Sequence, residues 1–348
     1  MKKVIHIQLR AIVWLLLFFF AGHSFAQSVK LHWIDSRSAT QAGVSFGVPF
    51  PKGKVAKSQA FSLVDAKNQS QALQTWPMAY WPDGSIKWLG CAAVANASDS
   101  FFLMPIKKSV PQKPMSVASG VDAIDINTGA ADFCIARKGN SVLKFIRIDN
   151  KMVAENSRLV ASLEKRTGED EIQYRYFESE ITNAEVEQTG AVRTVVKITG
   201  VHKQQNAEKR LFPFTVRLYF YAGQKSVRMV HSFIYDGDQQ SDFIKSLGVQ
   251  FDVPMRESLH NRHIRFSGEN NGLWSESVKP LIGRYPFTFR NEKNLAEKQF
   301  AGERLPEITA DDERAFDFYN DFPSWNDYKL TQLSANGFSI YKRTNNKS

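Results

Sequence analysis

The chain has 348 residues, of which 43% are hydrophobic and 23% are charged, a balance that is typical of folded globular proteins and excludes a disordered chain. This length allows two domains of ordinary size. The formal net charge of +10 favours an acidic partner such as a glycan, although the same charge could serve only solubility.

The N-terminus has the three parts of a secretory signal peptide. A basic start, "MKKVIHIQLR", precedes the apolar stretch "AIVWLLLFFFAG", and small residues follow at Ser24 and Ala26. The apolar stretch is about a dozen residues long, too short for a helix that spans a bilayer. We therefore expect residues 1–26 to be removed and the rest to be secreted or periplasmic, with no membrane partner afterwards.

Export also limits the partners and the chemistry of the cysteines. Loss of three basic residues with the signal peptide lowers the net charge from +10 to +7, and an exported protein of this charge is not expected to bind nucleic acid. An oxidising compartment would permit a disulfide between Cys91 and Cys134. Both lie in apolar, strand-like segments, so buried free thiols are the favoured prediction.

Aromatic residues are concentrated in residues 74–90, "QTWPMAYWPDGSIKWLG". The sequence Trp81-Pro82-Asp83-Gly84 predicts a tight turn, because proline fixes φ and glycine accepts a positive φ. In the strand that follows, period two places Trp88 on the same face as Ile86, Gly90, Ala92 and Val94. We expect Trp88 to fill the core of a small barrel. Trp76 and Trp81 are expected to be half exposed, where each could stack on a sugar.

The remaining pattern is almost entirely that of β-strands. The segment "VRLYFYAGQKSVRMVHSFIYDGD" alternates apolar and polar residues on both sides of a short turn and predicts a hairpin with His231 packed in the core. Only "SRLVASLEKR", residues 157–166, suggests a short helix. The proline- and lysine-rich residues 105–120 predict a linker. The fold class is therefore all-β, with a small N-terminal β-barrel over residues 27–112 and a large antiparallel β-sandwich over residues 113–345.

Several segments resemble one protein family in the same order. "GVSFGVPFPKGKV" and "LQTWPMAYWPDGSIKWLGCAAV" resemble the N-terminal RIFT-type barrel of the exo-acting rhamnogalacturonan lyases and their bacterial relatives. "IDINTGAADFCIARKGNSVLKFIRIDNK", "FIYDGDQQSDFIKSLGVQFDVP", "HIRFSGENNGLWSESVKPL" and "FYNDFPSWNDYKLTQLSANGFSIYKRT" resemble their central β-sandwich. In that family the sandwich precedes a helical (α/α) toroid, whereas this sequence stops at Ser348. The resemblance thus implies the β-domain part of an exported polysaccharide lyase, inactive alone, with a catalytic domain on a separate chain as one option.

A lyase of this kind needs a base, a cation that neutralises the uronate carboxylate, and an acid for the leaving oxygen. The best local set of candidate catalytic residues lies in "SLHNRHIRFSGENNGLW". There His263 and Arg265 would share a strand face, with His260 and Arg262 beside them, and Tyr285 is a weaker candidate. A solvated basic strand with a structural salt bridge is the competing interpretation of this segment.

The other predicted partners follow from composition and from the same resemblance. Trp76, Trp81 and Trp274 are candidate carbohydrate-binding residues for an acidic, pectin-like polysaccharide. No cofactor is predicted, although Asp236, Asp238 and Asp242 could hold a Ca²⁺ ion if they are not simply a polar turn. A non-catalytic carbohydrate-binding or scaffolding module is the alternative to the lyase-related function.

Overall fold

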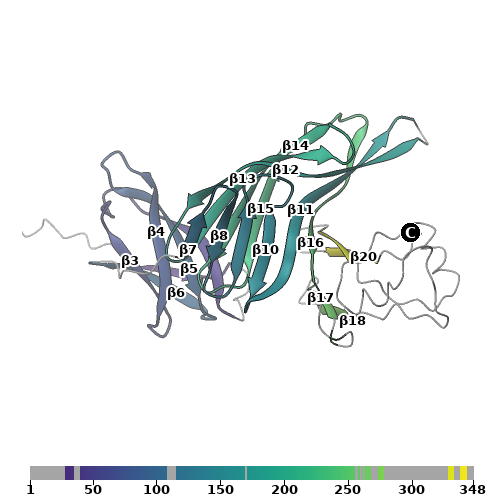
Figure 1. Ribbon diagram of the computed structural model, residues 1–348. Helices are drawn as coiled ribbons and strands as arrows, with labels where there is room; N and C mark the ends of the chain where they lie inside the picture. Colours follow the sequence, from purple (N-terminus) through teal and green to yellow (C-terminus); the bar gives the residue numbers. More distant parts are fainter. Residues whose placement is uncertain are drawn as a thin grey trace, which may run out of the picture. The chain divides into compact units, whose positions relative to one another are not determined.

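The computed structural model describes residues 28–34, 40–107, 115–168, 171–254, 258, 261, 263–267, 273–277, 328–332 and 338–342 (Figure 1). The regular elements within these residues are β-strands, which confirms the all-β prediction. The chain divides into two compact units, one made of Met1–Pro114 with Gly190–Arg193 and the other of Met115–Thr189 with Thr194–Ser348. A search of the described residues for helices long and apolar enough to cross a membrane finds none.

The first unit is a six-stranded sheet in the order β1-β6-β3-β4-β5-β2. Its strands are β1 (Val29–His32), β2 (Ala42–Pro49), β3 (Ala60–Asp65), β4 (Ser70–Tyr80), β5 (Ile86–Ala95) and β6 (Ser100–Ile106). The sheet curls around buried apolar side chains, among them Val48, Phe61 and Leu103. This half-barrel confirms the predicted small barrel. Pro105 and Ile106 are the last residues of β6, so the predicted linker begins later than residue 105.

The predicted turn between β4 and β5 is confirmed. Gly84 has φ +80°, and its amide donates to the carbonyl oxygen of Trp81 at 2.9 Å. The Asp83 carboxylate accepts from the amide of Ser85 at 3.0 Å and from its hydroxyl at 2.6 Å. A glycine suits this position because a residue with a Cβ rarely adopts a positive φ.

The prediction that Trp88 fills the barrel core is wrong, since its side chain is 41% exposed. The pairing of β4 with β5 shifts register near Ala79, and on β5 Lys87 and Trp88 are both exposed between buried Ile86 and Leu89. Such a bulge interrupts the period of two. The Trp88 ring lies against Gly47 of β2 instead, where a Cβ would collide with it.

The second unit contains a ten-stranded sheet in the order β15-β14-β13-β12-β11-β10-β9-β8-β7, with β16 paired to β11. Its strands are β7 (Ser116–Ser119), β8 (Ala123–Asn127), β9 (Asp132–Ala136), β10 (Leu143–Ile148), β11 (Lys151–Arg166), β12 (Ile172–Gln188), β13 (Arg193–Gln204), β14 (Arg210–Tyr221), β15 (Val227–Phe233) and β16 (Asp242–Asp252). Two hairpins follow, β17 (His263–Ser267) with β18 (Leu273–Ser277), and β19 (Tyr328–Gln332) with β20 (Phe338–Lys342).

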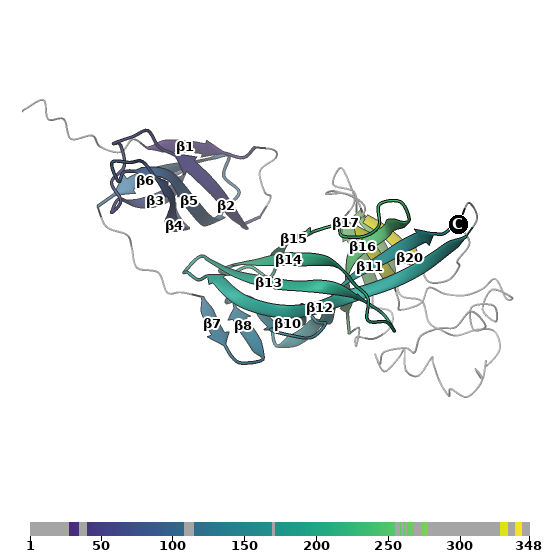
Figure 2. The same cartoon turned by 90° about the horizontal axis from the view of Figure 1, so that it is seen from above.

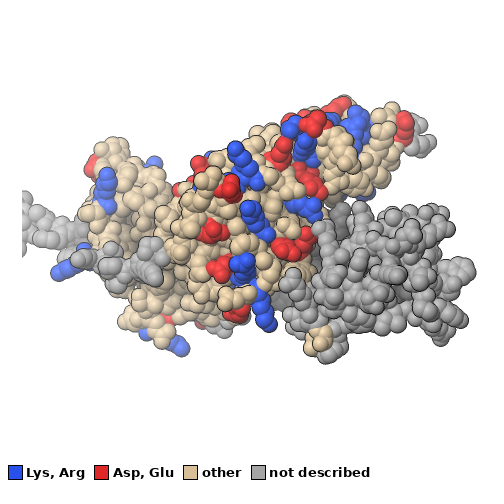
Figure 3. Space-filling model, viewed as in Figure 1, with Lys and Arg blue, Asp and Glu red and all other residues tan. Residues whose placement is uncertain are grey.

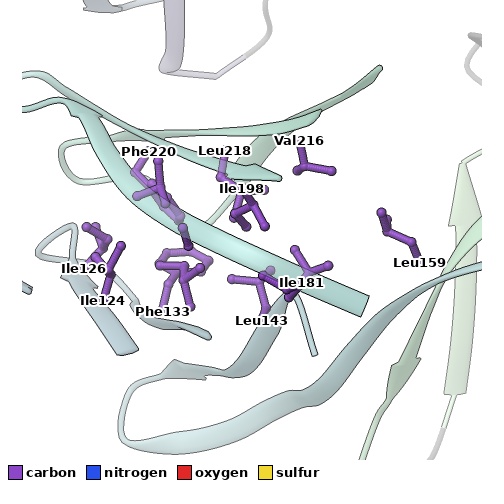
Figure 4. Close-up of a cluster of buried hydrophobic side chains, with 14 of the residues drawn as sticks. Ile124, Ile126, Phe133, Leu143, Leu159, Ile181, Ile198, Val216, Leu218 and Phe220 are labelled. Carbon is purple, nitrogen blue, oxygen red and sulfur yellow. The ribbon is translucent and has the colours of Figure 1, made fainter. Parts of the chain in front are cut away.

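This sheet folds over itself into two layers. The first half of β11 pairs with β10, and its second half pairs with β12. As a result β7, β8 and β10 face β13, β14 and β15 (Figure 2). Side chains from both layers meet in one apolar cluster (Figure 4), in which the rings of Phe133 on β9 and Phe220 on β14 have centroids 5.0 Å apart. The predicted β-sandwich is confirmed.

Two local predictions for the second unit had opposite outcomes. The hairpin is confirmed, since β14 pairs with β15 in a register that places Val216 opposite His231. The short helix is wrong, because residues 157–166 form the second half of β11, with β12 on one edge and β16 on the other. Leu159, Ala161 and Leu163 are buried at alternate positions, which is the period of a strand.

Both cysteines are buried free thiols, as predicted. Burial raises the pKa of the Cys91 thiol to about 12, so it stays protonated and unreactive at neutral pH.

Candidate functional site

Three of the predicted site residues lie in the β17–β18 hairpin. His263 and Arg265 are two positions apart in β17 and pair with Ser277 and Ser275 of β18, while Trp274 pairs with Phe266. The strand predicted for His263 and Arg265 is therefore present. The other candidates of this group, His260, Arg262 and Tyr285, lie outside the described residues. The catalytic and sugar-binding roles assigned to this group stay predictions.

The turn end of the β4–β5 hairpin carries aromatic rings next to lysines. The Trp81 ring is held by its indole N–H, which donates to the carbonyl oxygen of Phe50 at 2.9 Å, and the Lys87 ammonium lies 4.7 Å from the ring centroid. Tyr80 is 43% exposed, with the Lys57 ammonium 5.5 Å from its ring centroid. We call Tyr80, Trp81, Lys57 and Lys87 the aromatic–lysine cluster. Such a cluster offers ring faces for stacking and ammonium groups for a carboxylate.

Trp76 lies outside this cluster. Its ring lies against Gly90 of β5, and the Arg193 guanidinium stands 4.3 Å from the ring centroid. Arg193 also donates to the Ser45 hydroxyl at 2.6 Å, and the Gln74 side chain accepts from its amide at 2.9 Å. These contacts hold a cation on the ring of Trp76. The difference from Trp81 lies in the cation, since Arg193 is tethered to Ser45 whereas Lys87 is exposed, and Trp76 is therefore less suited to sugar stacking than Trp81.

Replacing Trp88 by alanine is expected to lower the free energy of unfolding by only about 1 kcal/mol, far less than the loss of a buried tryptophan. The reason is that the ring is exposed and covers Gly47 without reaching the core. The midpoint of urea denaturation measures the change, with the core variant Leu89→Ala as the reference. A loss for Trp88→Ala as large as that for Leu89→Ala would contradict the outward placement.

A polar hollow on the second unit was not found by sequence analysis. It has a volume of about 300 Å³ and is lined by Gly139, Asn140, Glu178, Ser179, Glu180, Lys203, Gln204 and Gln205. The Gln205 amide donates to the Glu178 carboxylate at 2.6 Å, and Arg210 donates to both oxygens of Glu180 at 2.6 and 3.1 Å. This hydrogen-bonded contact with Arg210 lowers the pKa of the Glu180 carboxyl, so the group accepts hydrogen bonds as an anion.

The three aspartates that could have held Ca²⁺ are engaged in hydrogen bonds and an ion pair. Asp236 accepts from the amide of Phe212 at 2.7 Å. Asp238 accepts from the amide of Gln240 and the hydroxyl of Ser241, and Asp242 lies 3.7 Å from the Lys209 ammonium. Within the described part of the chain, no group of three or more potential metal ligands comes together. The contacts of Asp238 with Gln240 and Ser241 are those of a polar turn.

The sandwich also packs together two histidines, fully buried His202 and half-buried His231, with ring centroids 5.7 Å apart. His202 is fully buried, and its Nδ1 lies 2.9 Å from the carbonyl oxygen of Phe212, so that nitrogen carries the hydrogen. His231 lies against Phe214 and Phe233, which confirms its predicted packing. Burial lowers the pKa of both rings, that of His231 to about 4. Both histidines are therefore neutral at pH 7 and serve the core.

Comparison with known families now adds to this geometry. Residues 115–348 match the PcRGLX-like protein central beta sandwich domain, and residues 27–104 match the PcRGLX-like N-terminal RIFT barrel domain. The chain belongs to the PcRGLX-like family. This membership confirms the resemblance to rhamnogalacturonan lyase-like proteins and makes both units carbohydrate-related β domains.

Two individual proteins show how far the similarity extends. The "Uncharacterized protein YetA" of Bacillus subtilis (strain 168) is 34% identical over 322 residues, which cover 90% of this chain and 37% of that protein. The chain thus spans little more than a third of this relative. An alpha-mannosidase structure from Enterococcus faecalis V583 has 9% identity and a TM-score of 0.41, over 74% of this chain and 34% of that one.

Proposed function

We propose that the chain provides the carbohydrate-binding β domains of an exported polysaccharide lyase-like protein, and that its ligand is an acidic, pectin-like glycan such as rhamnogalacturonan. The aromatic–lysine cluster carries this proposal. An indole ring can stack on a sugar, and an ammonium group a few ångströms away can pair with the carboxylate of a uronate residue. The positive net charge favours the same class of ligand.

We further propose that β-elimination needs a catalytic domain beyond the residues of this chain. Base, cation and acid must converge on one uronate within hydrogen-bond reach. In this proposal His263 and Arg265 contribute a base and a carboxylate clamp, and the further domain contributes the remaining groups. The second candidate function is a binding or scaffolding module without turnover, which the exposed ring of Tyr80 in the aromatic–lysine cluster favours.

Export is part of the proposal and has its own test. The order of basic, apolar and small residues at the N-terminus motivates processing between Ala26 and Gln27. Intact-mass analysis of protein recovered from the periplasm or medium is expected to find a chain that begins at Gln27. A chain that retains Met1 would count against export by this route.

Binding to a rhamnogalacturonan I oligosaccharide is expected to weaken about five- to tenfold in Trp81→Ala and in Lys87→Gln, because each removes one half of a ring–ammonium pair. Isothermal titration calorimetry at low and high salt measures this, and the affinity should fall as salt rises. Lys30→Gln removes an exposed lysine of the same unit outside the cluster and is the matched control.

The same preparation tests turnover through the absorbance of the unsaturated uronate product. We expect no turnover from this chain alone. Turnover that disappears in His263→Ala would place a complete active site in the β domains. It would overturn the proposal that β-elimination needs a further catalytic domain. If Trp81→Ala and Lys87→Gln both bind the oligosaccharide as tightly as the original chain, the aromatic–lysine cluster is not the binding site.

A further inference from the structure

One face of β12 presents a continuous row of outward side chains. Tyr174 and Tyr176 are each 52% exposed, and Glu178 and Glu180 continue the row toward the polar hollow. Phe177 and Ser179, between these residues, are buried on the other face. Alternate residues of a strand lie about 7 Å apart. Two exposed rings thus lead along one strand into a hollow lined by carboxylates.

The neighbouring strands hold the two rings in place. In the pairing of β11 with β12, Glu164 lies opposite Tyr174 and Ser162 lies opposite Tyr176. The Arg166 guanidinium is 2.6 Å from the Glu164 carboxylate and 4.9 Å from the ring centroid of Phe243 on β16. Glu164 and Ser162 are themselves buried, and the Ser162 hydroxyl is hydrogen-bonded to that of Ser246, so these groups hold the sheet beside the rings. The two tyrosine rings are the exposed part of this surface and can stack on the apolar face of a sugar.

In the hollow, donors and acceptors come from both sides of the row. Lys203 and Gln205 approach from the β13 side, and Asn140 approaches from the opposite edge of β12. The carboxylates of Glu178 and Glu180 are 23% and 35% exposed, so each keeps some contact with solvent although it is paired. Carboxylate, amide and ammonium groups together can bond several hydroxyls of one ring.

We propose that this row is a second carbohydrate subsite, in which the hollow takes one neutral pyranose ring and Tyr176 and Tyr174 stack on the rings that follow. This deepens the proposed function, because it rests on a glycan being the ligand.

The subsite selects a neutral sugar because its central acceptors are already anionic. A uronate in the hollow would bring a third carboxylate next to Glu178 and Glu180, whose charges are matched by Arg158 and Arg210. Acidic and basic side chains are interspersed on the viewed face (Figure 3), so that face offers no broad positive field to an acidic chain. The hollow is an open depression of about 300 Å³, which leaves room for a single ring.

The test is saturation-transfer NMR and titration with two neutral tetrasaccharides, cellotetraose and β-1,4-galactotetraose, against tetragalacturonate. At least one neutral probe is expected to bind, with affinity reduced about tenfold in Tyr176→Ala and at least threefold in Gln205→Ala. Phe251→Ala removes a ring that is 39% exposed but does not line the hollow, and Arg217→Gln breaks an ion pair elsewhere on the sheet. Both controls should bind like the original chain, and thermal midpoints check that every variant is folded.

The outcomes separate the two proposals. Failure of both neutral probes to bind, or binding that Tyr176→Ala and Gln205→Ala leave unchanged, overturns the subsite. In that case salt-sensitive binding of the acidic oligosaccharide through Trp81 and Lys87 would still support the proposed function. A third outcome is that a neutral oligosaccharide binds, that Tyr176→Ala weakens this binding, and that no acidic oligosaccharide binds. This outcome would support the subsite and overturn the proposal of an acidic ligand.

Discussion

Replacing Phe220 by alanine is expected to lower the free energy of unfolding of the second unit by about 3–5 kcal/mol, the range for emptying a buried phenylalanine site. Phe220 is fully buried, and its ring contacts Phe133 from the opposite layer at a centroid distance of 5.0 Å. Its loss would leave a cavity where the two layers of the sandwich meet (Figure 4). The midpoint of chemical denaturation, followed by far-ultraviolet circular dichroism, measures the effect.

The control for this variant is Val230→Ala on β15, where the valine is 37% exposed. This change should cost less than about 0.5 kcal/mol, because it removes little buried surface. Equal denaturation midpoints for the two variants would mean that Phe220 does not join the layers. The strand assignment of the hairpin would still stand in that case, since it rests on backbone pairing.

Acidification from pH 7 to pH 4 is expected to reduce the stability of the second unit through His202 and His231. Burial lowers the pKa of His231 from 6.5 to about 4 and also lowers the pKa of His202. The folded chain therefore binds fewer protons than the unfolded chain in this interval, and its stability is complete above pH 6.5 and falls as the pH drops toward 4. For His231 the loss is about 2–3 kcal/mol, after discounting for the part of the ring that solvent reaches.

His231→Phe tests this cause because it keeps an aromatic ring against Phe214 and Phe233 but removes the titrating group. Thermal midpoints measured at half-unit steps between pH 7 and pH 4 should decline less steeply in this variant. Carboxylates whose pKa is lowered, such as Glu180, act mainly below this interval, since they lose their charge only in stronger acid. A decline of unchanged slope in His231→Phe would assign the acid sensitivity to other groups.

The two proposed glycan-binding surfaces lie in different units and differ in chemistry. The aromatic–lysine cluster combines rings with positive charge, whereas the β12 row combines rings with compensated carboxylates. Binding measurements with acidic and neutral probes can therefore address each surface separately. Variants in one unit serve as controls for the other.

Much of the fold could be predicted from local pattern. The period of two from Val216 to Tyr235 specified a hairpin because a one-residue slip would turn every apolar side chain to the wrong face. The Pro82-Asp83-Gly84 turn follows from backbone conformations that few other residues adopt. The ordered segments of the barrel and the sandwich were sufficient to identify the family, since that similarity depends on residues along the chain rather than on contacts.

The errors and omissions have a different origin, in contacts between strands that are distant in sequence. Both faces of β5 carry apolar residues, so pattern alone could not decide that a bulge turns Trp88 outward onto Gly47. Residues 157–166 have apolar spacing compatible with a short helix or a strand, and pairing on both edges selects the strand. The hollow joins residue 139 to residue 205, and local sequence carries no signal for such a meeting. Local periodicity thus determined the strands and turns of this protein, whereas strand pairing and burial decided which side chains are core and which are free to bind.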